Sequence, residues 1–135
     1  MAGELEGVAN ELFQALDARD SEKLISNTDA DAQSVDENSR RWLRGRDELE
    51  SYLGQMFEMV ADVHTTLRDV TEHIWGDTSV LTCWLEQRYT LEGNEQQISA
   101  PTTIIFRRST GEWRLALFHS IPLSEHDVSD PGVTL

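Results

Sequence analysis

The sequence predicts an α+β fold in which three N-terminal helices pack on a curved, mostly antiparallel sheet. Before residue 63 the apolar residues recur at helical spacing, whereas after it apolar and polar residues alternate through four successive segments. These segments are 9 to 14 residues long. Strands usually have about 5–6 residues, so this length indicates strong curvature. A long helix across the concave side would leave a cone-shaped hollow.

The helical half contains three segments. Residues 4–18 place one apolar face on an amphipathic helix, formed by Val8, Leu12, Ala15 and Leu16. Asp20 can cap a short second helix over residues 21–26. A third helix follows Gly45, with Asp47 as its cap and Glu50 at capping-box spacing, and it runs to about residue 62. Its apolar stripe comprises Leu49, Tyr52, Leu53, Met56, Val60 and Val63.

The alternating half predicts antiparallel strands at residues 67–75, 79–91, 95–108 and 113–121, joined by tight turns. A brief strand is expected near residues 32–35. Pro101 cannot donate a ladder hydrogen bond, so it marks a sheet edge or a bulge. We expect one domain over residues 1–122, followed by a polar tail over residues 123–135.

Charge and composition exclude several classes of function. The chain has 135 residues, with 11 basic and 25 acidic side chains and a net charge of −14, which makes nucleic acid and anionic membranes poor partners. A signal peptide and a membrane span are absent from the pattern, which favours the cytoplasm. The single cysteine, Cys83, lies in an apolar run and is expected to pack as a small hydrophobe. We expect no metal site and no cofactor, because the histidines lack ligand spacing and the glycines are isolated.

The last predicted strand, "WRLALFHS", carries a histidine whose direction decides its role. Strict alternation places Trp113, Leu117 and His119 on one face, and Phe118 and Ser120 on the other. If the histidine face is concave, His119 is a site residue; if it is the outer face, His119 belongs to a subunit contact. Because both faces are mostly apolar, we expect a homodimer through the open face of the sheet.

Three stretches carry a family resemblance over residues 4–121: "ALDARDSEKLIS", "LRGRDELESYL" and "FRRSTGEWRLALFHS". Together with the element order, they resemble the SnoaL-like and ketosteroid-isomerase-like branch of the NTF2-like superfamily, whose fold is an α+β cone. The resemblance implies an apolar pocket for a small organic ligand. It also implies cofactor-independent acid–base chemistry of the isomerase, cyclase or dehydratase kind on a carbonyl substrate. The alternative is a non-catalytic ligand-binding or dimerisation domain.

The isomerase residues carry over only in part. Asp36 matches the spacing of the family's aspartate base before Gly45. By spacing from Asp20 and Gly111, Leu12 and Thr103 stand where the family has the tyrosine and the protonated aspartate that stabilise the dienolate. A leucine donates no hydrogen bond and a threonine is a weaker donor, so a steroid isomerase of the usual type is not expected.

The candidate catalytic residues are therefore Asp36, as a base, and His119, as an assisting acid or positioning group. Asp36 could instead bond its own turn in "VDENS", and His119 could be anchored within the fold. The strand carrying Glu86 and Arg88 could form a polar floor of the cavity, or these residues could be solvated or lie at a dimer interface. Side chains expected to line a ligand site are Trp42, Tyr52, Met56, Trp84, Glu86, Arg88 and Thr103.

Overall fold

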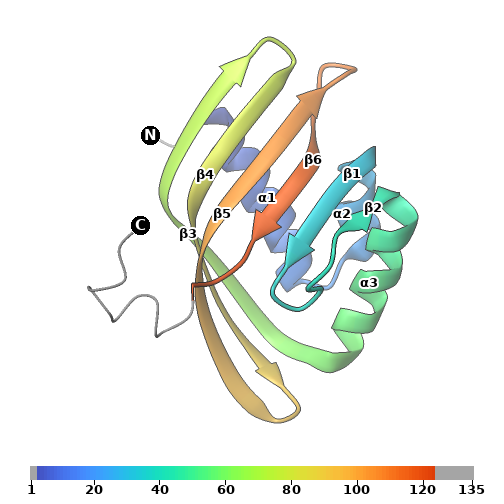
Figure 1. The fold of residues 1–135 in the computed structure, drawn as a ribbon, viewed down its shortest axis with the longest axis vertical. Coiled ribbons are helices and arrows are strands. Elements are labelled where there is room, and N and C mark those ends of the chain that lie inside the picture. Colours follow the sequence, from blue (N-terminus) through green and yellow to red (C-terminus); the bar gives the residue numbers. More distant parts are fainter. Residues whose placement is uncertain (1–2, 124–135) are drawn as a thin grey trace.

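A computed structural model describes residues 3–123 and confirms the predicted α+β class: three helices lie on one face of a curved, six-stranded sheet (Figure 1). The helices are α1 (Glu4–Asp17), α2 (Ser21–Ser26) and α3 (Gly45–Met59). The strands are β1 (Thr28–Asp36), β2 (Leu43–Arg44), β3 (Val60–Trp75), β4 (Thr78–Leu91), β5 (Asn94–Arg108) and β6 (Trp113–Ser120). No helix within these residues is long and apolar enough to cross a membrane. Residues 124–135 of the predicted tail lie outside the described residues.

The strands follow the order β2-β1-β6-β5-β4-β3, and every neighbouring pair is antiparallel except β1 and β6, which run parallel. The four-strand meander of the sequence prediction is therefore confirmed. Pro101 lies just beyond the last pair of β5 with β6, Thr102 with Ser120. At Pro101, β5 has only β4 as its neighbour, so this proline sits at a local edge, as expected.

The third helix differs from the prediction at both ends. It begins at Gly45, where φ is +85°, and the backbone N–H of Arg44 donates to Glu48 Oε1 at 2.9 Å. The predicted cap at Asp47 is therefore wrong. The helix also ends at Met59, and Val60 and Val63 belong to β3. A register shift in β3 between residues 61 and 64 lets both valines face the core, so a bulged strand reproduces helical spacing.

The sequence also underestimated the first strands. The strand expected near residues 32–35 is longer in the structure, where β1 runs from Thr28 to Asp36. The short strand β2 was not predicted. β1 is largely polar and carries a weak period-two signal, and β2 has only two residues. They form because β1 pairs with the apolar β6 and because Leu43 of β2 is buried.

Two apolar clusters hold the helices on the sheet. One lies under α1 and is built from Leu5, Ala9, Leu12, Leu81, Cys83, Ile104, Phe106 and Trp113. The other joins α3 to β3 and β4 and comprises Leu53, Met56, Val60, Val63 and Tyr89. In addition, the carboxylate of Glu72 on β3 accepts hydrogen bonds from the backbone N–H groups of Leu5 and Glu6, which satisfies donors of the first turn of α1. The helices are thereby fixed over one end of the sheet.

Cys83 should be chemically inert in the folded protein. Burial, together with the nearby charge of Glu6, raises the pKa of the Cys83 thiol to about 11. Only about one thiol in a thousand is then ionised at pH 8. We expect iodoacetamide to label the native protein far more slowly at pH 8 than protein unfolded in urea, with a rate that rises up to about pH 11. Labelling of the native protein at the rate of the unfolded chain would contradict this environment.

Candidate ligand cavity

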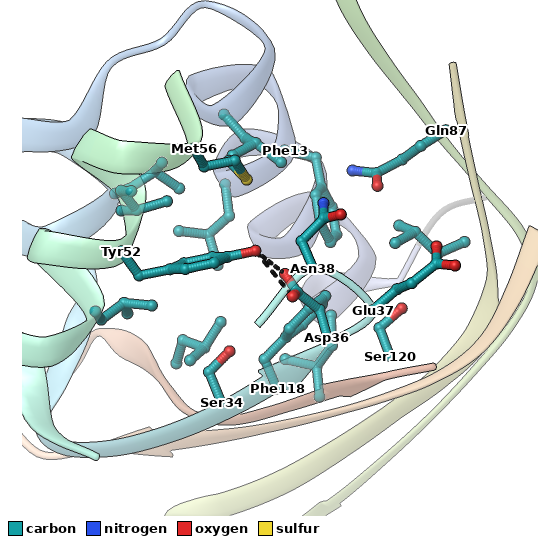
Figure 2. Close-up of a pocket in the computed structure, with 18 of the residues that line it drawn as sticks. Phe13, Ser34, Asp36, Glu37, Asn38, Tyr52, Met56, Gln87, Phe118 and Ser120 are labelled. Atoms are coloured by element: carbon teal, nitrogen blue, oxygen red, sulfur yellow. Dashed lines mark hydrogen bonds between the residues drawn. The ribbon is translucent and has the colours of Figure 1, made fainter. Parts of the chain in front are cut away.

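Asp36 is the last residue of β1, and the turn that follows fixes its carboxylate. The backbone N–H of Ser39 donates to Asp36 Oδ1 at 2.7 Å, and the Ser39 hydroxyl accepts from the Asp36 N–H at 3.0 Å. This is the self-bonded turn that the sequence offered as an alternative to a functional role. This turn does not exclude a functional role for Asp36, because it directs the carboxylate toward α3 (Figure 2).

Tyr52 approaches this carboxylate from α3. Its hydroxyl lies 2.8 Å from Asp36 Oδ1 and 2.9 Å from Oδ2, and it donates to the carboxylate (Figure 2). Burial and, next, the negative charge of Asp36 raise the pKa of Tyr52 far above its ordinary value. The phenol is therefore protonated throughout the physiological range and acts as a donor to Asp36.

The pair lies in a cavity of about 120 Å³ between the helices and the concave face of the sheet. Its apolar wall is formed by Leu12, Phe13, Leu16, Leu24, Leu49, Leu53, Met56, Leu85, Ile98, Ile104, Leu115 and Phe118. Its polar groups belong to Thr28, Ser34, Asp36, Glu37, Asn38, Tyr52, Gln87 and Ser120. Glu37 and Asn38 come from the turn after β1, so they gather beside Asp36 (Figure 2).

The electrostatic character of the cavity is one-sided. Asp36 and Glu37 both line it, whereas no lysine, arginine or histidine does so within the described part of the chain. Burial and the charge of Glu37 also raise the pKa of Tyr89, which lies in the α3 cluster. Two carboxylates therefore face a largely apolar space with no cationic side chain among its lining residues.

The predicted site residues separate into two groups. Asp36, Tyr52 and Met56 line the cavity together. His119, Trp84 and Thr103 instead line a groove on the outer face of the sheet. The remaining three also lie outside the cavity: the Trp42 ring lies 6.1 Å from that of His119, Glu86 bonds Arg68 at the surface, and Arg88 is exposed.

The direction of His119 follows from a bulge in β6. Phe106 of β5 pairs with Leu115 and Ile105 pairs with Leu117, so Ala116 has no partner on β5. The extra residue reverses the alternation. Trp113 and Leu115 pack toward the helices before it, and Phe118 and Ser120 do so after it. The expectation that His119 shares a face with Trp113 is therefore wrong, and His119 points outward.

Several cavity residues were not predicted as site residues. Glu37 and Asn38 lie in a polar turn whose sequence looks solvated. The sequence pattern places Ser120 only on the face opposite His119, and Gln87 lies between the predicted site residues Glu86 and Arg88. The alternation of β4 could have found Gln87, because it shares a face with buried Leu85 and Tyr89. Among residues 3–123, no group of His, Cys, Asp and Glu side chains is arranged to hold a metal ion.

Solved structures with the same fold have low sequence identity to the chain. A ketosteroid isomerase-like protein from Erwinia carotovora atroseptica is 21% identical, with a TM-score of 0.76, over 88% of this chain and 93% of that one. An NTF2-like family protein from Streptomyces avermitilis is 24% identical, with a TM-score of 0.78, over 87% and 94%. The CaMKII hub of S. rosetta is 18% identical, with a TM-score of 0.77, over 91% and 99%.

These likenesses establish the fold and leave the activity open, because the matched proteins include both an isomerase-like protein and a kinase hub. A comparison with curated proteins found no match. The family profile described as a SnoaL-like domain matches residues 5–124, which is nearly the whole chain. The protein therefore belongs to the SnoaL-like domain family of the NTF2-like fold.

Proposed function

We propose that the cavity binds a small, mostly apolar organic molecule and that Asp36 acts there as a general base on a carbonyl substrate, without a cofactor. The observation that carries this proposal is the position of the Asp36 carboxylate in the wall of an apolar cavity. A cavity of about 120 Å³ is comparable to the ~150 Å³ apolar cavity that binds benzene in another protein. A molecule of about one ring fits this space.

The free lone pairs of Asp36 identify the basic atom. Oδ1 already accepts from Ser39 N–H and from the Tyr52 hydroxyl, whereas Oδ2 accepts only from Tyr52. A carboxylate has about four acceptor sites, so Oδ2 has room for a proton. In the proposed step a C–H bond next to the carbonyl breaks, its proton moves to Oδ2, and its electron pair forms an enolate. Return of the proton to another carbon then completes an isomerisation.

His119 has no part in this proposal, because it lies on the opposite face of the sheet. The side chains that remain able to donate to a carbonyl oxygen are Ser34, Asn38 and Gln87, whose amide has one N–H to spare. Leu12 lines the cavity at the position where the resemblance places an isomerase tyrosine, and it cannot donate. This missing donor is the observation that favours the second candidate function, a ligand-binding domain without catalysis.

The two functions predict different results with cyclohexanone, a ketone of suitable size. General base catalysis contributes about 10²–10⁴-fold to a rate. We therefore expect the protein to accelerate exchange of the ketone's α-protons for deuterium in D₂O, measured by NMR, and Asp36→Asn to reduce this acceleration at least about 100-fold. Asp31→Asn, an exposed change in the same strand, is the matched control. Saturable binding with no accelerated exchange would establish the binding domain instead.

We also propose that two copies of the chain pair through the outer face of the sheet. The alternation of β4, β5 and β6 places Val80, Trp84, Ile105 and Leu117 on that face. At the margin of this outer face, the side chains of Ile121 and Leu123 are 38% and 50% exposed. The row of Thr82, Thr103 and His119 lies between Trp84 and the other three residues. An exposed face with this much apolar surface is typical of an interface, and a sheet face can pair with itself about a twofold axis. A cytoplasmic location stays a prediction.

A further inference from the structure

We propose that the cavity selects ligands that donate hydrogen bonds, meaning neutral or cationic molecules with a hydroxyl or amine on a small apolar body, and that it rejects carboxylates. This inference rests on the proposed function, because it specifies the ligands of the same cavity: a carbonyl substrate is expected to carry a hydroxyl or amine as well, since its carbonyl adds only an acceptor. It follows from the directions of the hydrogen bonds around the cavity wall.

The hydroxyl of Tyr52 has a single proton, and that proton is directed to the carboxylate of Asp36. The phenol oxygen can therefore offer a ligand only its lone pairs. Because this tyrosine is protonated, it contributes no negative charge, but it is not available as a donor while the contact to Asp36 persists. Asp36 itself, as a carboxylate, can only accept.

The single proton of the Ser120 hydroxyl is also already used in a hydrogen bond within the protein. The hydroxyl of Thr102 donates to the backbone carbonyl of Ala100 at 3.0 Å, so its only proton is used. The 2.8 Å contact between the hydroxyls of Thr102 and Ser120 must then run from Ser120 to Thr102. Both hydroxyls are buried, which makes the chain costly to reverse. Ser120, which pairs with Asp36 across β1 and β6, consequently presents an acceptor to the cavity.

Thr28 repeats the pattern, because its hydroxyl donates to the carbonyl of Leu24 at 2.7 Å. One N–H of Gln87 is also used, by the hydroxyl of Thr65 at 3.1 Å. Free donors of the cavity wall are therefore confined to Ser34, Asn38 and the second N–H of Gln87. Acceptors prevail near Asp36, and within the described residues no cationic side chain lines the cavity to balance its carboxylates.

A ligand that brings its own donor completes this arrangement. A hydroxyl placed near Asp36 Oδ2 can donate its one proton to that oxygen, and an amine has further protons for a second acceptor such as Ser120 Oγ, whereas a bare carbonyl adds another acceptor. A carboxylate ligand would also meet the charges of Asp36 and Glu37 in a space of low polarity. The order of preference is therefore an amine or alcohol first, then an aldehyde, and finally a carboxylate.

The test uses four benzene derivatives of nearly equal size: benzylamine, benzyl alcohol, benzaldehyde and benzoate, with binding measured by calorimetry or ligand-observed NMR. One net hydrogen bond corresponds to about a threefold to tenfold difference in affinity. We expect benzyl alcohol to bind about threefold to tenfold more tightly than benzaldehyde. Benzylamine should bind at least as tightly as the alcohol, and benzoate at least about tenfold more weakly than it.

Variants assign the preference to the named groups. Asp36→Asn keeps the shape but adds an N–H donor, so it should remove the advantage of benzyl alcohol over benzaldehyde and weaken benzylamine most. Ser120→Ala should reduce the same advantage by removing one acceptor. Asp31→Asn, exposed on the same strand, should leave all affinities unchanged. Thermal unfolding of each variant verifies that it is folded.

The outcomes separate this inference from the proposed function. If benzaldehyde or benzoate binds as tightly as benzyl alcohol, the donor preference is wrong although the cavity still binds small apolar molecules. If the preference is present but survives Asp36→Asn, its assignment to Asp36 is wrong. If none of the four compounds binds the folded protein at millimolar concentration, both the proposed function and this inference fail.

Discussion

Inserting one alanine directly after Leu117 should abolish the cavity and severely destabilise the protein. Ala116 is already the extra member of the β6 bulge, since Phe106 pairs with Leu115 and Ile105 with Leu117. One more residue that enters the ladder would turn every following side chain of β6 to the opposite face. Phe118 and Ser120 would leave the cavity wall, and His119 would point into it.

The expected cost exceeds about 4 kcal/mol of unfolding free energy, the range reached when core packing and buried polar groups are lost together. Loss of a cooperative transition in urea or heat is the extreme form of this result. Deletion of Ala116 is the control, because it makes the pairs of Leu115 and Leu117 adjacent in a regular ladder and keeps Phe118 and Ser120 on the cavity face, so it should cost less than the insertion. If the insertion variant unfolds like the wild type and still binds benzyl alcohol, the register of β6 does not set the cavity wall.

The same bulge shows why the sequence predicted the fold better than the site. The three helices and the meander follow from periodicity, and local signals placed α2 and its cap at Asp20 correctly, where the carboxylate accepts from Lys23 N–H. By contrast, the bulge at Ala116 in β6 leaves no signal in the composition of the strand or in the strand propensity of its residues. It reverses the directions of His119 and Ser120, so the residue that looked catalytic faces outward and its neighbour faces the cavity.

Asp36 was predicted from the spacing before Gly45 that the family resemblance implies, and Tyr52 from its place on the stripe of the third helix. Their contact could not be predicted, since it depends on the parallel pairing of β1 with β6 and on the placement of α3. Trp84 and Thr103 were misplaced for a related reason. Alternation groups residues into faces, but tertiary packing alone decides which face the helices cover.

Replacing Trp84 with glutamate should dissociate the proposed dimer. Trp84 lies in the outer groove beside Thr103 and His119, and the guanidinium of Arg68 lies 5.6 Å from its ring. A central aromatic residue of an interface contributes about 2 kcal/mol or more, and a twofold axis counts the substitution twice. The dissociation constant should therefore rise by at least about 100-fold, measured by analytical ultracentrifugation over a concentration series.

Met59→Glu is the control for this change, because Met59 is 54% exposed at the end of α3, away from the outer sheet face. It should leave the dimer intact. Trp84→Glu should also leave the affinity for benzyl alcohol unchanged, since Trp84 does not line the cavity. A wild-type protein that sediments as a monomer at 100 μM, a concentration roughly 100-fold above a micromolar dissociation constant, would overturn the pairing. The outer face would then be an apolar surface without a second copy, and His119 would lie free on it.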